Sequence, residues 1–230
     1  MQTIPFLNLF YLVIPLIITW YFYFKWTEDK KDIIYASFRM VVQLLLIGYL
    51  LIFIFEDKNP LLGALIIFFM AIVSSQITIR NVQDKTLKHY GIILLAISGS
   101  VLIHLVLIIV FVLDIHHFYE PRYVIPIAGM VFANTMNAIS LSVERFEKER
   151  IRNDFFTARK IAFKAAMIPQ INSLLAVGLV ALPGMMTGQI LSGVDPLIAV
   201  RYQIMIMSMT LSTAGISIVT YFLLRRKDYE

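Results

Sequence analysis

The sequence predicts an all-α polytopic membrane protein with seven transmembrane helices, its N-terminus outside and its C-terminus in the cytoplasm. Three observations predict this fold. Hydrophobic residues make up 59% of the 230 residues and charged residues only 15%, against roughly 45–50% and about 25% in typical soluble domains. The few charged residues are concentrated between long uncharged runs. Basic residues are numerous in every second gap between these runs and rare in the gaps that alternate with them.

Seven uncharged runs follow one another along the chain. A membrane-spanning helix needs ~20 mostly apolar residues, with a range of about 17–25, and six of the runs reach this length. The second run is shorter, but the charged end of Arg39 can extend toward the membrane surface. We therefore expect one helix for each run, over residues 3–24, 40–55, 60–79, 90–113, 123–143, 165–194 and 202–224.

The run 165–194 is the least regular of the seven, because it contains Pro169, Pro183 and several glycines. A proline inside a helix removes a hydrogen bond and kinks or breaks the helix. Broken helices in membranes are tolerated where they are buried in protein or line a cavity, and they often mark transport pathways. We predict that this penultimate span is kinked or broken. A proline kink that simply packs against neighbouring helices is the alternative interpretation.

The distribution of basic residues sets the orientation. Seventeen of the 20 lysines and arginines lie in four segments, and these alternate with segments that hold the other three. Basic residues favour cytoplasmic loops, so the first segment is predicted outside and the last inside. The net charge of +5 then reflects the excess of basic residues in the cytoplasmic loops. It is therefore no sign of a nucleic-acid partner, and none is expected. We expect a multi-pass membrane protein, with residues 1–230 forming a single transmembrane domain.

The segment 144–164 is the one sizeable element that this topology places in the cytoplasm. Pairs such as Glu144–Lys148 stabilise an exposed helix, so the fifth helix should continue beyond the membrane. Asp154 is predicted to cap a new helix. The segment can be an interfacial helix with a solvated charged face, or a helix–turn–helix that docks onto a partner through aromatic anchors. The candidate docking residues are Arg152, Phe155, Phe156, Arg159 and Lys160.

Known catalytic patterns are missing from the sequence, so we do not expect an enzyme. The chain has no cysteine, no HExxH and no GxSxG, and these patterns belong to metalloproteases and serine hydrolases. A GxxxxGK[ST] phosphate-binding loop is also missing. We expect this chain to bind no cofactor, and we expect ATP and Mg²⁺ on a partner chain.

If the chain transports a solute, its energy source is expected to be external. All 15 acidic residues lie outside the uncharged runs, whereas proton-driven carriers usually hold an ionisable group within the membrane. His104 is the only mid-span residue with a near-neutral ordinary pKa. A self-sufficient channel or a proton-coupled transporter that uses His104 is the alternative to an ATP-driven transporter.

Polar side chains inside the later spans are candidates for a substrate pathway, because polar groups in lipid need partners or water. Asn134 and Asn137 are three residues apart and share one helix face. Contacts between helices are the alternative role for such residues. The candidate pathway residues are Asn134, Asn137, Gln170, Asn172, Ser173, Thr187, Gln189 and His104.

A weak candidate for a metal site lies in a loop predicted outside the membrane. Asp114, His116, His117 and Glu120 could bind a hard or borderline cation there. A solvated turn is the alternative interpretation. The 11 methionines are expected mainly to fill irregular gaps between helices.

Three segments resemble signature blocks of the FetB-type permease family: Arg39–Leu51, Tyr123–Phe146 and Ile168–Met207. The resemblance covers essentially the whole chain. It implies an inner-membrane ABC permease that works with a separate ATPase, and it implies that residues 144–164 meet that ATPase. Bacterial members of the family are linked to iron export and to resistance to oxidative stress. Related plant half-transporters are linked to aluminium tolerance.

The sequence and this resemblance together lead to one expected function. The chain should be the membrane-spanning permease subunit of an ABC transporter that exports iron or another metal-related solute. Two copies of the permease are expected to work with two cytoplasmic ATPase chains, since such transporters need two motor subunits. A membrane regulator or scaffold that moves no solute is a third possibility.

Overall fold

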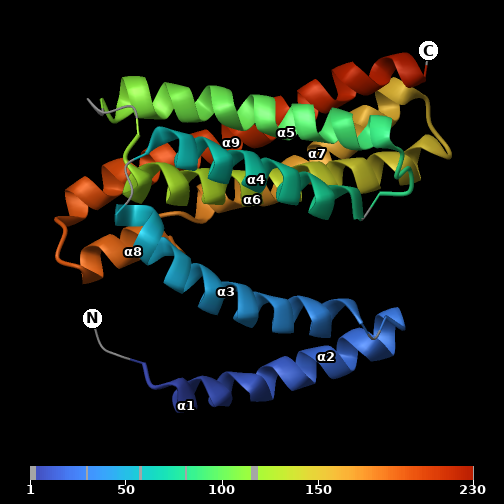
Figure 1. Ribbon diagram of the computed structural model, residues 1–230. Helices are drawn as coiled ribbons and strands as arrows, with labels where there is room; N and C mark the ends of the chain where they lie inside the picture. The colour runs from blue at the N-terminus through green and yellow to red at the C-terminus, as the bar shows by residue number, and fades with distance from the viewer. Residues whose placement is uncertain (1–3, 30, 57–58, 81, 115–118, 230) are drawn as a thin grey trace. The chain divides into compact units, whose positions relative to one another are not determined.

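The computed structural model describes residues 4–29, 31–56, 59–80, 82–114 and 119–229. These residues form α-helices joined by short connections, and the described part of the chain contains no β-strand (Figure 1). The chain divides into two compact units, Met1–Asp57 and Lys58–Glu230. The predicted all-helical fold class is confirmed.

The first unit holds two long helical segments. Helix α1 (Phe6–Leu9) continues through a short 3₁₀ turn into α2 (Val13–Thr27), and α3 (Asp32–Glu56) follows. The described side chains of this unit are not buried, and large apolar ones such as Leu44 and Phe53 are exposed. Apolar side chains on every side of a helix are typical of a segment that faces lipid. Thr3, the predicted start of the first span, lies outside the described residues.

The second unit is a helical bundle with a buried core. Its helix α6 (Pro121–Arg150) packs against α4, α5, α7 and α9 (Figure 1). The core between them is made of apolar side chains such as Ile97, Val143 and Ile218. The other helices of the unit are α4 (Pro60–Arg80), α5 (Leu87–Leu107) with a π-helical continuation over Ile108–Val112, α7 (Phe155–Ala176), α8 (Gly184–Leu191) and α9 (Pro196–Arg225) with a 3₁₀ turn over Arg226–Asp228.

Six helices among the described residues are long and apolar enough to cross a membrane. They correspond to the predicted runs other than 165–194. In that run, α7 ends at Ala176 and α8 begins at Gly184, so the predicted break within the run is confirmed. The total of seven spans and the orientation stay predictions.

The interruption between α7 and α8 satisfies much of its own backbone. The N–H groups of Leu179, Val180 and Ala181 all donate to the carbonyl oxygen of Ala176. Gly178 has φ of +81°, a left-handed conformation that glycine adopts without steric cost. Internal hydrogen bonding of this kind is what lets an irregular backbone lie within a membrane.

A close contact between α4 and Tyr119, just before α6, leads to a prediction for Gly63. A Cβ atom at Gly63 would overlap the aromatic ring of Tyr119, whose side chain is buried. Gly63→Ala should therefore destabilise the protein by about 1–3 kcal/mol, the usual cost of overpacking a core. Denaturant unfolding in detergent, followed by circular dichroism, measures this.

Gly99→Ala is the matched control, because nothing lies within 4 Å of its added Cβ. Alanine is the better helix former, so this variant should unfold at the same or a slightly higher denaturant concentration. Equal destabilisation of the two variants would contradict the packing of Tyr119 on Gly63.

Candidate functional site

The α6–α7 turn is built as the sequence predicts. Helix α6 continues to Arg150, and α7 begins at Phe155 with Asp154 as its N-cap. The Oδ1 atom of Asp154 accepts a hydrogen bond from the N–H of Thr157 at 3.2 Å. The hydrogen bonds from Thr157 hold the pKa of Asp154 below its usual value. Glu144 and Lys148 form the predicted ion pair on α6. The turn between the two helices is short, since α6 ends at Arg150 and α7 begins at Phe155, and Asp154 caps it.

The two phenylalanines predicted as docking anchors lie in different environments. Phe155 is only 8% exposed and belongs to the hydrophobic core, whereas Phe156 is 50% exposed. A side chain that is already buried in its own protein cannot anchor a partner without local unfolding. Of the predicted pair of anchors, the structure therefore leaves only Phe156 exposed, and its docking role stays a prediction.

Phe156 is flanked by two arginines. The guanidinium of Arg159 lies 5.1 Å from the centre of the Phe156 ring, and that of Arg226 lies 5.6 Å from it. Both distances are within the range of cation–π contacts. Arg152 and Lys160, the other predicted docking residues, are exposed. The turn thus presents an aromatic ring within a cluster of positive charge.

Aromatic rings fix the base of this turn to the end of α9. Phe146 of α6 lies 5.0 Å from Phe222 and 5.5 Å from Phe155, between ring centres. Tyr229 completes the cluster at 5.6 Å from Phe155. Buried aromatic pairs of this kind add about 0.5–1.5 kcal/mol each beyond their burial. The base of the α6–α7 turn consequently belongs to the bundle core, and the turn is not a free loop.

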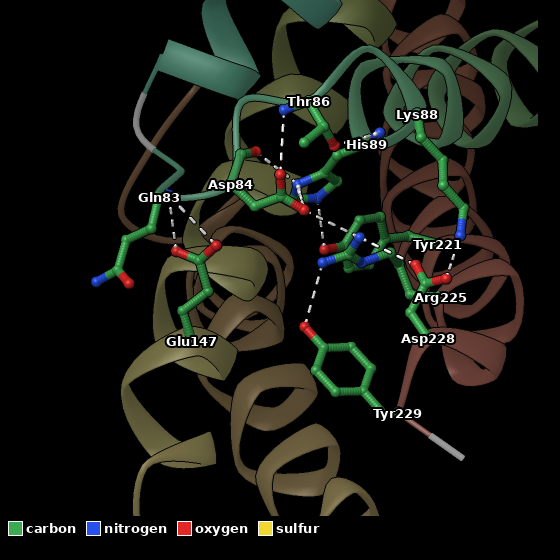
Figure 2. A network of polar contacts seen from close by, with 10 residues as sticks. All are labelled: Gln83, Asp84, Thr86, Lys88, His89, Glu147, Tyr221, Arg225, Asp228 and Tyr229. Atoms are coloured by element: carbon green, nitrogen blue, oxygen red, sulfur yellow. Dashed lines mark hydrogen bonds and ion pairs between the residues drawn. The ribbon is translucent and has the colours of Figure 1, made fainter.

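A polar network lies next to this aromatic cluster (Figure 2). At its centre is Arg225, near the end of α9, which is only 7% exposed. Its Nη1 donates to Oδ2 of Asp84 at 3.1 Å and to Oδ2 of Asp228 at 3.0 Å, and its Nη2 donates to the hydroxyl of Tyr229 at 3.2 Å. Burial raises the pKa of Asp84, but hydrogen bonds from Thr86 and the charges of His89 and Arg225 outweigh it, so this pKa lies below its usual value.

His89 extends the network into the bundle core. Its Nδ1 lies 2.7 Å from the carbonyl oxygen of Asp84, and its Nε2 lies 2.8 Å from the hydroxyl of Tyr221. A carbonyl oxygen can only accept, so Nδ1 carries the proton in this geometry. In the neutral ring, Nε2 then accepts from Tyr221. This chain of contacts joins the start of α5 to α9.

A further contact joins the same region to α6. The N–H of Gln83, in the α4–α5 connection, donates to the carboxylate of Glu147 at 3.1 Å (Figure 2). The ends of α5, α6 and α9 and the α4–α5 connection are thus tied together next to the α6–α7 turn. We call this region, defined by Asp84, His89, Glu147 and Arg225, the polar end of the bundle.

Two of the predicted pathway residues meet in the middle of the bundle. Gln170 donates from Nε2 to Oδ1 of Asn134 at 3.0 Å, and Asn134 donates from Nδ2 to the carbonyl oxygen of Thr210 at 3.1 Å. This chain of hydrogen bonds crosses α7, α6 and α9. Between membrane helices, each such bond contributes on the order of 1 kcal/mol.

The other predicted pathway residues are not brought together with this pair. His104 is buried, and its Nδ1 lies 2.8 Å from the carbonyl oxygen of Ser100 on its own helix. Thr187 donates to the carbonyl oxygen of Leu182 within the α7–α8 interruption. Oε1 of Gln189 is buried without a hydrogen-bond partner in the described structure. The side chains of Asn137, Asn172 and Ser173 are exposed.

A cavity of about 340 Å³ lies where α7, α8 and α9 meet. Its lining includes Leu174, Met186, Ile204 and Met207, together with the polar Gln203 and Ser208. Gln203 is only 5% exposed, and its Oε1 has no hydrogen-bond partner in the described part of the chain. The sequence prediction missed Gln203. The sequence does contain one signal for it, because Gln203 is an amide at the second position of the uncharged run 202–224 and lies beside a cluster of methionines.

The weak metal candidates stay untested. Asp114 and Glu120 are described, but His116 and His117 lie outside the described residues. The residues that the structure does describe contain no group of three or more histidine, cysteine, aspartate or glutamate side chains that could hold a metal ion.

Comparison with known proteins gives a consistent result. The family described as "Uncharacterised protein family (UPF0014)" matches residues 6–229. The UPF0014 membrane protein YjkA of Bacillus subtilis is 34% identical over 206 residues, which cover 83% of this chain and 81% of that protein. No solved structure matches the chain.

Two further relatives carry more specific names. The probable iron export permease protein FetB of Escherichia coli is 33% identical over 221 residues, covering 87% of this chain and 83% of FetB. The protein ALUMINUM SENSITIVE 3 of Arabidopsis thaliana is 30% identical over 209 residues, covering 83% of this chain and 74% of that protein.

Proposed function

This chain belongs to the UPF0014 family, and from that premise we propose that it is the membrane-spanning permease subunit of an ABC transporter. In this proposal a separate cytoplasmic ATPase chain binds ATP and Mg²⁺ and supplies the energy. The cargo is iron or another metal-related solute, and it is exported. The name of FetB, a probable iron export permease, supports this cargo, and the name of ALUMINUM SENSITIVE 3 supports a role related to metals.

The single observation that carries the proposal is that the α6–α7 turn is exposed at its surface while aromatic contacts hold its base in the bundle core. Phe156 is half exposed between two arginines, while its neighbour Phe155 is fixed in the aromatic cluster. An exposed aromatic ring on a rigid helical turn is the kind of anchor that inserts into a groove of a partner. A turn held by the core can also pass the motion of that partner to α6, α7 and α9.

The proposed assembly follows from the need for a paired motor. Two copies of the permease lie in the inner membrane, and each α6–α7 turn contacts one ATPase chain in the cytoplasm. This orientation rests on the excess of basic residues in the segments predicted inside. The polar end of the bundle then faces the cytoplasm.

Co-purification with the ATPase tests the proposal. The double variant Phe156→Ala, Arg159→Ala should reduce the amount of ABC ATPase recovered with the tagged permease at least tenfold, because losing one aromatic anchor costs about 2 kcal/mol or more at an interface, and 1.4 kcal/mol is already a factor of ten. Both side chains are partly or largely exposed, so the variant should still fold.

Phe111→Ala is the matched control. Phe111 is 78% exposed but lies in the π-helical continuation of α5, at the opposite end of that helix from His89. This variant should recover as much ATPase as the unchanged protein. Normal recovery with the double variant would reject the docking assignment.

A further inference from the structure

The α6–α7 turn carries positive charge that its own carboxylates do not balance. Arg152, Arg159 and Lys160 are partly or largely exposed on it, and none of the three forms an ion pair within the described part of the chain. Asp154 is the only acidic residue between positions 150 and 164, and its carboxylate already caps α7. The turn therefore offers three cations to a partner.

The carboxylates nearest to the turn are used elsewhere in the protein. Glu144 and Glu149 each pair with a basic residue one turn away on α6. Asp228 pairs with Arg225 at 3.0 Å in the polar end of the bundle. These acidic groups stabilise the helices and their packing, so carboxylates for the three cations have to come from outside this part of the chain.

The cations surround an exposed aromatic ring. Phe156 is 50% exposed, and the guanidinium of Arg159 lies 5.1 Å from the centre of its ring. Arg226, from the end of α9, lies 5.6 Å from the same ring. An arginine packed over a ring still presents the edge of its planar guanidinium, which matches a carboxylate with two parallel hydrogen bonds. The surface is thus an apolar centre bordered by cations.

The length of α6 bears on which partner can reach this surface. Helix α6 continues through positions 144–150, beyond the uncharged run 123–143, and at about 1.5 Å per residue this adds roughly 10 Å. The polar layer on each side of a membrane is only about 5–8 Å thick. In the predicted topology the turn lies at or beyond the outer edge of the lipid headgroups, which favours a soluble protein over lipid as its partner.

We propose that the ATPase surface that receives the α6–α7 turn is an apolar hollow bordered by carboxylates, with Phe156 in the hollow and the carboxylates paired with Arg152, Arg159 and Lys160. This inference rests on the proposed docking of an ATPase, and it adds the chemical character of the partner's surface. Aromatic and arginine side chains dominate the binding energy of interfaces. Opposite charges around them speed association and exclude wrong partners.

Binding of the purified ATPase to the full chain in nanodiscs of phosphatidylcholine tests this inference, with the affinity measured by biolayer interferometry. Phosphatidylcholine has no net charge, so a salt effect cannot come from attraction to the lipid. Raising KCl from about 50 mM to about 300 mM screens exposed charges and should weaken binding about three- to tenfold, mainly through slower association.

A triple variant removes the three charges and keeps the aromatic anchor. Arg152→Gln, Arg159→Gln, Lys160→Gln should bind the ATPase about three- to tenfold more weakly at low salt, and the same rise in KCl should change its affinity less than about twofold. Arg122→Gln is the matched control, because it removes an exposed positive charge at the opposite end of α6. This variant should bind and respond to salt like the unchanged protein.

Two results would overturn the inference: binding that does not respond to salt, or a triple variant that binds as tightly as the unchanged protein. Both are expected if the three cations serve only the headgroups of anionic lipids.

Phe156→Ala, measured in the same nanodiscs, separates this failure from that of the proposed function. If Phe156→Ala weakens binding at least tenfold while salt and the triple variant have no effect, docking through the turn stands and only the acidic character of the partner is rejected. If the ATPase binds Phe156→Ala as well as the unchanged protein, the docking assignment itself is rejected, and this inference with it.

Discussion

Arg225→Met should lower the free energy of unfolding by about 3 kcal/mol, which is toward the low end of the cost of breaking a buried ion pair. Arg225 is 7% exposed and donates hydrogen bonds to Asp84, Asp228 and Tyr229. Methionine fills a similar space but leaves two carboxylates without their shared cation. The expected loss of free energy lies at the low end of this range because the carboxylates of Asp84 and Asp228 keep some contact with solvent. Denaturant unfolding in detergent measures the change.

Lys88→Met is the matched control for Arg225→Met. Lys88 also pairs with Asp228, but its side chain is 70% exposed, and exposed ion pairs contribute about 0–1 kcal/mol. We therefore expect a change of less than about 1 kcal/mol. Similar losses in the two variants would mean that Arg225 does not hold the polar end of the bundle together.

The same substitution should weaken docking of the ATPase. The aromatic cluster beneath the α6–α7 turn contains Phe222 and Tyr229, which lie on either side of Arg225 in the sequence. Loss of the Arg225 contacts frees the end of α9 and with it the base of the turn. Recovery of ATPase should fall with Arg225→Met and stay unchanged with Lys88→Met.

Local features of the sequence predicted much of this architecture. The lengths of the uncharged runs located the long helices, because the apolar thickness of a membrane fixes the length of a span. The side chain of Asp154 and the charge pairs of residues 144–150 predicted the capped α6–α7 turn, since capping and i,i+4 pairing depend only on neighbours in the sequence. Prolines and glycines likewise predicted the break before α8.

Features that depend on distant residues could not be predicted in the same way. Asp84, His89 and Arg225 are separated by up to 141 residues in the sequence, and only packing of the helices brings them together. Phe155 and Phe156 are adjacent and identical in type, yet the packing of α6 and the end of α9 around Phe155 decides which of them is buried. Gln203 became a candidate only when its burial and its unpartnered oxygen were seen.

Transport in reconstituted vesicles is expected to show the largest effect of these experiments, since iron accumulation should be present with both proteins and absent when either is left out. Purified permease and its ABC ATPase are placed together in sealed vesicles, with the α6–α7 turn and the ATPase on the outside. Addition of Mg-ATP and iron(II) to the outside should then give accumulation of iron inside, because export from the cytoplasm corresponds to uptake in this orientation. Vesicles with either protein alone should show only the leak of protein-free vesicles.

The double variant Phe156→Ala, Arg159→Ala serves as the internal control of this experiment. It should insert normally and lose ATP-dependent accumulation in proportion to its loss of bound ATPase, whereas Phe111→Ala should keep it. These two variants separate a failure of docking from a failure of the permease itself.

ATP-dependent iron accumulation in these vesicles is the measurement that tests the central claim most directly. The account predicts accumulation that requires the permease, the ATPase and hydrolysable ATP together, and that stops when the α6–α7 turn loses Phe156 and Arg159. Accumulation by the permease alone, driven by a proton gradient without ATP, would contradict it and establish a self-sufficient transporter instead.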